Sequence, residues 1–155
     1  MRFSLCRCVV LLTLICAAVP AFAQQDRVGV VTAVNRKATG QPPDRPIEQL
    51  MIGSTVVRKE KISTFAKGQA QILFTDQSTI TLGENSQIII DDFVFDPKTG
   101  ASQITATVSA GLVRYGGRIS EKAGAEFVTP SGSVTVRGGG ALITVKPKSV
   151  SSSDR

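Results

Sequence analysis

Apolar and polar residues alternate along much of the chain, most clearly between Gln69 and Asp91, which reads QAQILFTDQSTITLGENSQIIID. Apolar side chains occupy every second position up to Phe74 and again from Ile80 to Leu82. Two short polar turns, Thr-Asp-Gln-Ser and Gly-Glu-Asn-Ser, separate the runs. Because a period of two gives a strand one apolar and one polar face, this stretch predicts three short strands around one core.

The same alternation continues on both sides of this stretch, and no segment after the first 23 residues reads as a convincing helix. Further strands are expected at Arg27–Val34, Thr55–Arg58, Lys61–Thr64, Phe93–Phe95, Gln103–Val108, Leu112–Tyr115, Glu126–Thr129, Ser133–Arg137 and Ala141–Val145. Asn35–Pro46 is rich in proline, which lacks a ladder N–H, and therefore predicts an exposed loop. Ile47–Met51 is compatible with a single helical turn.

The spacing of these segments predicts the fold class. About ten short strands at intervals of roughly 8–12 residues are typical of an all-β domain. Frequent glycine breaks and polar strand faces favour a coiled or solenoid-like stack, in which each coil covers the next. A β-sandwich is the alternative that the same pattern allows.

The first 23 residues have the parts of a secretory signal peptide. Arg2 and Arg7 supply the positive region, Val9 to Val19 the apolar region, and Ala21-Phe22-Ala23 the small-residue cleavage site. The apolar run is shorter than the roughly 20 residues that a transmembrane helix needs. We therefore expect cleavage near Ala23, a periplasmic or secreted protein, and no stable membrane span.

Composition narrows the chemistry that is available after cleavage. All three cysteines lie within residues 1–23 and the sequence has no histidine, so the mature chain lacks both residue types. The Ser-His-Asp and Cys-His mechanisms and ordinary zinc sites are thereby excluded. We predict that the protein is not an enzyme and binds no metal or cofactor. Residues 24–145 form one expected domain, and the polar, Ser-rich residues 146–155 are an expected disordered tail.

The charge pattern argues against nucleic acid as a partner. Cleavage removes Arg2 and Arg7, which lowers the formal net charge from +6 to about +4. The remaining charges are scattered, and the chain has no Trp and one Tyr. Nucleic-acid binders instead gather basic residues on one face and add aromatic rings for stacking.

Five segments, taken in order, carry a family resemblance. They are Ile47–Val56 with Ile62–Thr64, Gly68–Phe74, the two turns that contain Asp76–Ser78 and Leu82–Ser86, Gly111–Arg114, and Thr129–Gly138. Together they resemble the FecR-type domain, the periplasmic part of iron-dicitrate sensors. One departure is that Arg137 is followed by Gly138-Gly139-Gly140, where the family often continues Arg-Gly-Thr. The sensors also carry a cytoplasmic domain, a transmembrane helix and a receptor-contacting module, which we do not find here. The resemblance therefore implies a stand-alone exported FecR-type domain.

This resemblance and the lack of catalytic side chains lead to one functional expectation. The domain acts without catalysis, through protein or envelope contacts, as a signalling accessory. Its expected partner is an envelope protein, such as an outer-membrane receptor or a membrane regulator, and self-association stays open. The alternative is a module for cell-wall glycan or polysaccharide, which rests on a predicted polar sheet face. That face would contain Gln103, Thr105, Thr107, Ser109, Thr79 and Thr81.

Three residues are candidates for a partner contact or a structural clamp. Arg137 stands at a strand end beside glycines, where its guanidinium group can bind carbonyl oxygens or a carboxylate. Arg114 closes the Gly111–Arg114 motif. Asp76 belongs to a Thr-Asp-Gln-Ser turn, in which a short carboxylate is expected to bind the local backbone.

Two other groups are weighed as binding sites and set aside. Asp91, Asp92 and Asp96 could form an acid pair or a calcium site, but adjacent residues of a strand are expected to point to opposite faces. Gly138–Gly140 could hold a phosphate with its backbone N–H groups. A strand follows these glycines in place of the usual helix, so the sequence predicts a bulge or a tight hairpin there.

Overall fold

The computed structural model describes residues 27–35 and 37–146, so the expected signal peptide and residues 147–155 lie outside the described part. The described strands are β1 (Arg27–Val34), β2 (Ala38–Gln41), β3 (Glu48–Gln49), β4 (Thr55–Val57), β5 (Lys61–Thr64), β6 (Ala70–Phe74), β7 (Thr79–Leu82), β8 (Gln87–Asp96), β9 (Ala101–Gly116), β10 (Ala123–Thr129), β11 (Gly132–Arg137) and β12 (Gly140–Val145). The all-β prediction is confirmed, and residues 27–35 and 37–146 include no helix able to cross a membrane.

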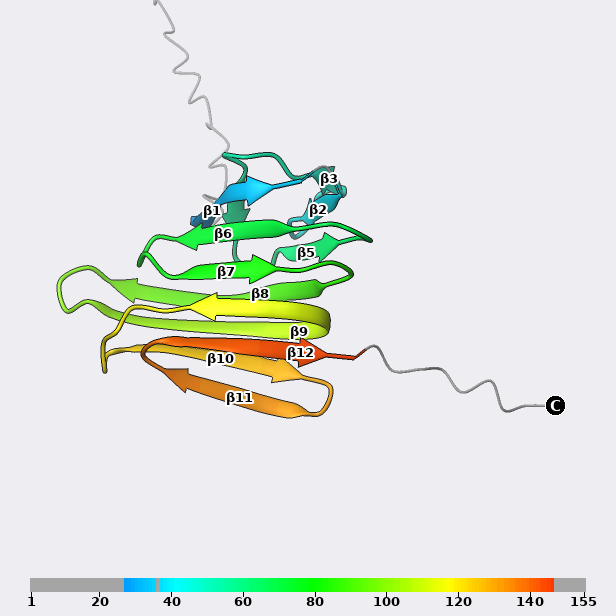
Figure 1. Cartoon of the computed structure of the whole chain (residues 1–155). Coiled ribbons are helices and arrows are strands. Elements are labelled where there is room, and N and C mark those ends of the chain that lie inside the picture. The colour runs from blue at the N-terminus through cyan, green and yellow to red at the C-terminus, as the bar shows by residue number, and fades with distance from the viewer. Residues whose placement is uncertain (1–26, 36, 147–155) are drawn as a thin grey trace, which may run out of the picture.

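Strand β9 organises the molecule because it belongs to two sheets in turn (Figure 1). Its first half pairs with β8 and β10 in a sheet that runs β3-β2-β5-β8-β9-β10-β11. Its second half pairs with β7 and β12 in a sheet that runs β4-β1-β6-β7-β9-β12. We call these the back sheet and the front sheet. Every pairing is antiparallel except that of β9 with β10, which is parallel.

The chain repeatedly changes sheet as it advances. It passes from the back sheet to the front sheet between β5 and β6, returns between β7 and β8, and crosses again inside β9. The strands therefore stack as a curled, coil-like all-β structure that has two faces, as the sequence led us to expect. Most neighbours are nevertheless antiparallel, because hairpins such as β6–β7 and β8–β9 lie within the coil.

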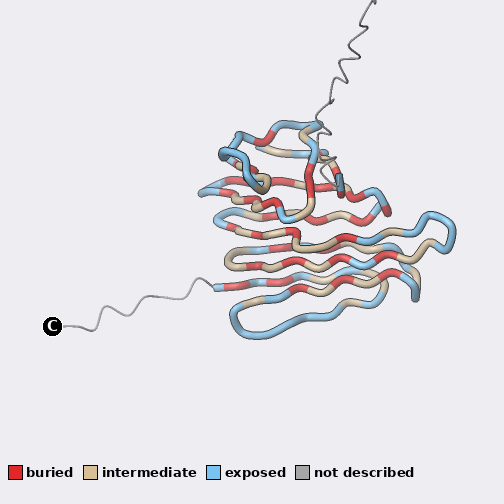
Figure 2. The backbone as a smooth tube through the Cα atoms, turned by 180° about the vertical axis from the view of Figure 1, so that it is seen from behind, coloured by how far each residue is buried: buried red, intermediate tan, exposed pale blue. Residues whose placement is uncertain are grey.

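One core lies between the two sheets (Figure 2). Side chains alternate between buried and outward positions, most regularly in β6 and β7. Ile72 and Ile80 of the front sheet and Ile104 and Phe127 of the back sheet are completely buried. The rings of Tyr115 and Phe127 meet edge to face across the core, with centroids 5.4 Å apart. The alternation seen in the sequence thus corresponds to one shared interior.

The point where β9 changes sheet depends on a glycine. Gly111 has a φ of +92°, a backbone conformation that disfavours residues with a Cβ atom. A Cβ atom built there would overlap Oγ and Cα of Ser86. The N–H of Leu112 donates to Ser86 Oγ at 2.9 Å, and the N–H of Ser86 donates to Thr64 Oγ1 at 2.9 Å. Side-chain hydroxyls thus join three successive turns on this side of the coil.

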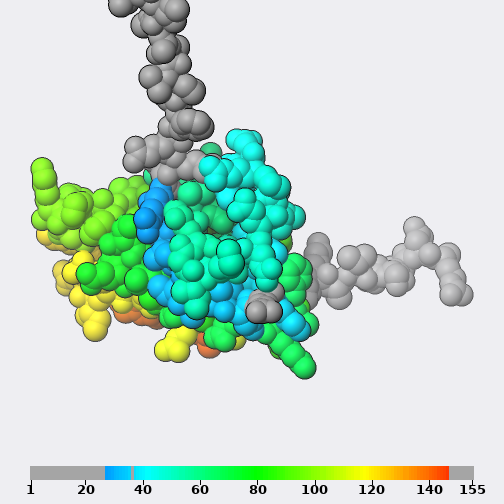
Figure 3. Space-filling model, turned by 90° about the horizontal axis from the view of Figure 1, so that it is seen from above, coloured from blue at the N-terminus to red at the C-terminus, as the bar shows by residue number. Residues whose placement is uncertain are grey.

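The segment before β4 covers the N-terminal end of the core. Seen from above, atoms of β1 and of the segment that carries β2 to β4, coloured blue to teal, fill this end (Figure 3). Leu50 inserts its side chain into the core here. Two predictions for this region are wrong. Asn35–Pro46 contains strand β2, because its prolines begin only at Pro42, and Ile47–Met51 forms β3 in place of a helical turn.

Candidate interaction surface

Arg114 lies on the outer face of the front sheet, exposed to solvent. It stands opposite Thr81 of β7 on one side and Leu142 of β12 on the other. Thr81 in turn stands opposite Gln71 of β6. Since directly opposite residues of neighbouring strands share a face, these four side chains form one row across four strands. The strands position the guanidinium group, and no described side chain pairs with it.

Two shallow hollows adjoin Arg114. The first, of about 470 Å³, lies between Arg114 and the end of β1, and Gln71 and Asn35 contribute polar atoms to it. The second, of about 610 Å³, lies towards β12 and is lined by Ile119, Leu142 and several glycines. Arg114 therefore stands between a polar and a more apolar depression.

Exposed apolar side chains flank this arginine. Leu112, two residues before Arg114 on β9, is 41% exposed, and Leu142 is 67% exposed. Ile119, in the loop after β9, is almost fully exposed at 97%. Arginine beside exposed apolar residues is typical of protein contact surfaces. We call Gln71, Thr81, Leu112, Arg114 and Leu142 the Arg114 face.

Arg137 occupies a different place from Arg114. It ends β11 in the back sheet, stands opposite Gly124, and is exposed. Within residues 27–35 and 37–146 its side chain has no hydrogen bond or ion pair, so the clamp interpretation gains no support. Of the bulge or tight hairpin predicted at Gly138–Gly140, the hairpin is wrong, because β11 pairs with β10 whereas β12 pairs with β9. These glycines carry the chain from the back sheet to the front sheet.

Asp76 is buried in the turn between β6 and β7. Its Oδ1 atom accepts hydrogen bonds from the backbone N–H of Ser78 at 2.9 Å and from the Ser78 hydroxyl at 2.6 Å. The pKa of nearby Tyr115 is raised, first by burial and then by the negative charge of Asp76. Asp76 is thus enclosed by its own turn and a core tyrosine, so it is not accessible to a partner and does not share a site with Arg114.

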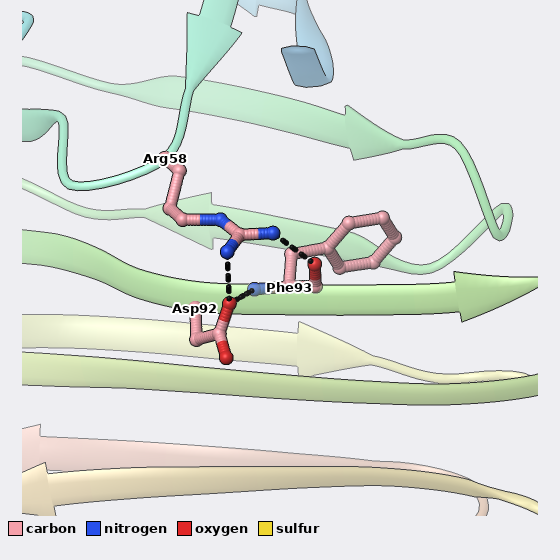
Figure 4. A network of polar contacts seen from close by, with 3 residues as sticks. All are labelled: Arg58, Asp92 and Phe93. Atoms are coloured by element: carbon pink, nitrogen blue, oxygen red, sulfur yellow. Dashed lines mark hydrogen bonds and ion pairs between the residues drawn. The ribbon is translucent and has the colours of Figure 1, made fainter. Parts of the chain in front are cut away.

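An ion pair that sequence reasoning missed joins β8 to the turn after β4 (Figure 4). Arg58 Nη1 lies 3.1 Å from Asp92 Oδ1, and Arg58 Nη2 donates to the carbonyl oxygen of Phe93 at 3.2 Å. The same Asp92 oxygen accepts the N–H of Phe93 at 2.9 Å. Arg58 and Phe93 are 35 positions apart, so no local pattern could have paired them.

The prediction that Asp91 and Asp92 point to opposite faces is wrong. A β-bulge shifts the register of β8 between Ile90 and Asp92, and both Ile90 and Phe93 are buried. The extra residue leaves Asp91 and Asp92 together on the outer face. Asp91 accepts the Thr107 hydroxyl at 2.7 Å, whereas Asp92 binds Arg58, so the two carboxylates have different partners. Across the described residues, no group of three or more His, Cys, Asp or Glu side chains is placed to hold a metal ion.

Glu60 is a buried carboxylate that the sequence did not single out. Burial raises its pKa, while a hydrogen bond from the backbone N–H of Val57 opposes the rise. Oε2 of Glu60 accepts that N–H at 2.9 Å and closes the turn between β4 and β5. Glu60 also lines a hollow of about 380 Å³ together with Arg45, Glu48 and Leu50. Its role in the turn is structural.

The polar residues that favoured glycan binding are divided between two surfaces. Thr79 and Thr81 lie on the outer face of the front sheet, on β7. Thr105 and Thr107 lie on the back sheet, where β9 pairs with β8. The prediction of one continuous hydroxyl-rich face is therefore wrong, because β9 changes sheet between these positions.

Comparison with known proteins gives one match. The family described as FecR protein matches residues 60–153, which is more than half of the chain. The matched part contains Arg114, Arg137 and Asp76 but excludes β1 to β4. Neither a curated protein nor a solved structure matches the chain.

Proposed function

Because the chain belongs to the FecR family, a family of signalling-related domains, we propose that it is a non-enzymatic binding domain for an envelope signalling protein. The partner docks on the Arg114 face. The observation that carries this proposal is the exposed guanidinium group of Arg114, held on a rigid sheet between Leu112 and Leu142.

A partner would gain both charged hydrogen bonds and apolar contacts on the Arg114 face. An arginine supplies five N–H donors in a fixed plane and remains charged at any physiological pH. Exposed leucines beside it add apolar area that contact removes from water. Arginine is enriched among the residues that dominate binding energy. A partner that presents a carboxylate within an apolar rim would match this arrangement.

The expected signal peptide supports the proposed place of action. The expected signal peptide would deliver the domain to the periplasm or outside the cell, where outer-membrane receptors and the external parts of membrane regulators are accessible. The glycan alternative lacks the continuous hydroxyl face on which it rested. We therefore retain the protein partner as the single proposal.

Capture of the partner from living cells tests this function. The protein carries an affinity tag, is crosslinked in its own host, and the captured envelope proteins are quantified for the parent, Arg114→Glu and Arg137→Glu. We expect the parent to capture one receptor or membrane regulator repeatedly, and Arg114→Glu to reduce that capture about tenfold, as loss of a central charged contact does. Arg137→Glu is the matched control on the other sheet. Equal capture by all three proteins, or capture of wall fragments alone, would overturn the proposal.

A further inference from the structure

The C-terminal end of the stack has the shape of a step. In the back sheet, β10 is followed by one more strand, β11, whereas in the front sheet β12 is the last strand. β10 and β12 both pair with β9, so β11 extends one strand beyond the front sheet (Figure 1). Among residues 27–35 and 37–146, two strand edges therefore have no partner at this end, one in each sheet.

The inner side of the step is apolar and incompletely covered. Val134 and Val136 of β11 stand opposite the buried Phe127 and Ala125 of β10, so all four side chains point to the core side of the sheet. No described strand lies across from β11, and Val134 remains 40% exposed. Figure 2 shows β11 as a largely exposed stretch at the C-terminal edge of the stack.

The two open edges also lack the usual protection against pairing. Natural edge strands commonly carry lysine, proline or inward charges that prevent edge-to-edge association. β12 contains no charged residue, and β11 has only Arg137, at its end. The N–H of Gly138 donates to the carbonyl of Ala123, so by antiparallel alternation the backbone groups of Thr135 point away from β10. These groups are available to another strand.

We propose that this end binds a second copy of the chain, with β11 of each copy paired to β12 of the other. A twofold axis parallel to the strands exchanges the back and front sheets and leaves the strand direction unchanged. β11 of each copy then occupies the empty position beside β12 of the other copy. Two equivalent strand pairings result. β9 reverses its direction where it passes from the back sheet to the front sheet (Figure 1). β11 runs against the first half of β9 and β12 runs against its second half, so β11 and β12 run in opposite directions and both new pairings are antiparallel. Both sheets become continuous, and Val134 and Val136 of the two copies meet across one extended core.

The alternative pairing of β11 with β11 fits less well. It would join the back sheets but leave two strand positions empty between the front sheets, with apolar side chains beneath the gap. The β11–β12 arrangement leaves no such gap and opposes no like charges within the strands. Isologous interfaces of this kind are the commonest in proteins.

The size of the step predicts a weak dimer. A six-residue strand is about 20 Å long, and the two packed sheets form two layers that are each about 10 Å thick, which gives an end face of roughly 400 Å² per copy. Such an interface is at the small end of specific association. We therefore expect reversible dimers in the micromolar range of concentration. This inference rests on the free edges of β11 and β12, whereas the Arg114 face rests on outward side chains of the front sheet, so either proposal can fail alone.

Analytical ultracentrifugation of the protein, expressed from the full-length gene, tests the dimer. Val134→Lys places a charge at the centre of the proposed contact and should raise the dissociation constant at least about tenfold. Val128→Lys is the matched control, because Val128 is also 40% exposed but lies on the opposite face of the neighbouring strand. Circular dichroism should show both variants folded. A parent that stays monomeric, or equal dimerisation of both variants, would overturn the proposal.

Two further variants test the strand pairing itself. Thr135→Pro removes an outward N–H without touching the β10 ladder and should abolish dimers, whereas Thr135→Ala should retain them. The mature chain is expected to contain no native cysteine, so a mixture of exported Thr135→Cys and Leu142→Cys chains should form an intermolecular disulfide between the introduced residues. Thr135→Cys chains that crosslink only to one another would indicate β11–β11 pairing and contradict the arrangement. A dimer that appears only after removal of residues 147–155 would assign this edge to the chain's own tail and also overturn the proposal.

Discussion

The hydroxyl of Ser86 lies where three turns of the chain meet, and its local sequence explains why. Ser86 belongs to the Gly-Glu-Asn-Ser turn that separates β7 from β8. Its side chain accepts the N–H of Leu112, and its backbone N–H binds Thr64. A buried N–H without a partner is costly, so a small hydroxyl at this position stabilises the coil.

Replacement of this hydroxyl should therefore reduce stability. Ser86→Ala leaves the N–H of Leu112 without its acceptor and should lower the free energy of unfolding by about 1–3 kcal/mol. Urea denaturation followed by circular dichroism measures the change. Ser131→Ala, at an exposed turn position, is the control and should stay within about 0.5 kcal/mol of the parent. Equal effects at the two serines would contradict the role given to Ser86.

The buried carboxyl group of Glu60 predicts how the stability of the protein depends on pH. Burial raises the pKa of Glu60 in the folded state above the ordinary value of 4.5. Between pH 4.5 and this raised pKa, the folded state therefore binds more protons than the unfolded state. Its contribution to stability is thus present at low pH and is lost as pH rises through its folded-state pKa. Glu60→Gln keeps an oxygen for the N–H of Val57 but removes the charge. It should flatten the fall in melting temperature from acid to neutral pH.

The controls for Glu60 are the acid limit and an exposed glutamate. Below pH 4.5 the parent and Glu60→Gln should show similar melting temperatures, because the parent's carboxyl group is then protonated. Glu121→Gln should leave the whole profile unchanged, since Glu121 is exposed. Parallel profiles for the parent and Glu60→Gln would show that Glu60 does not titrate in this range.

Strand β9 is the element on which the architecture depends, and Gly111 is the residue that allows it to cross between sheets. Gly111→Ala combines a left-handed φ with overlap at Ser86 and should cost about 3 kcal/mol or more of unfolding free energy. Gly100→Ala is a matched control. Its φ is +70° but no atom lies within 4 Å of the added Cβ, so only about 1 kcal/mol of backbone strain is expected. Similar costs at both glycines would refute a close contact between β9 and Ser86.

Alternation predicted individual strands well and their partners poorly. The segment Gln69–Asp91 contains β6, β7 and the first part of β8, as the period of two indicated. The parallel pairing of β9 with β10 could not be read in this way, because it joins residues such as Ile104 and Ala125 through non-local contacts. The β-bulge at Asp91 was not predicted either, because one extra residue interrupts the period of two without changing the composition of the strand.

For the candidate site, too, the sequence predicted the residues but not their surroundings in the fold. Arg114 was identified from a motif, but its exposure beside Leu112 and Leu142 depends on which residues of β9 and β12 face outward. Asp76 was identified from the same kind of motif, and its burial beneath Tyr115 followed only from the way the sheets close. A motif thus selects residue types, whereas the register of distant strands decides which of them a partner can reach.

At the scale of the whole molecule, the two sheets present opposite outer faces to solvent. The central claim is that a signalling partner docks on the front face, around Arg114, and the back face supplies a natural comparison. Leu112 lies on the front face and Val94 on the back face, and both are exposed. A short-range photocrosslinker can therefore be placed on either face without disturbing the core.

Photocrosslinking from these two positions in living cells tests the claim most directly. The photoreactive residue replaces Leu112 in one strain and Val94 in another, and the adducts are identified by mass spectrometry. We predict that position 112 gives a repeated adduct with one outer-membrane receptor or membrane regulator, and that position 94 gives none. Adducts with the same protein from both positions, or from position 94 alone, would contradict docking on the Arg114 face.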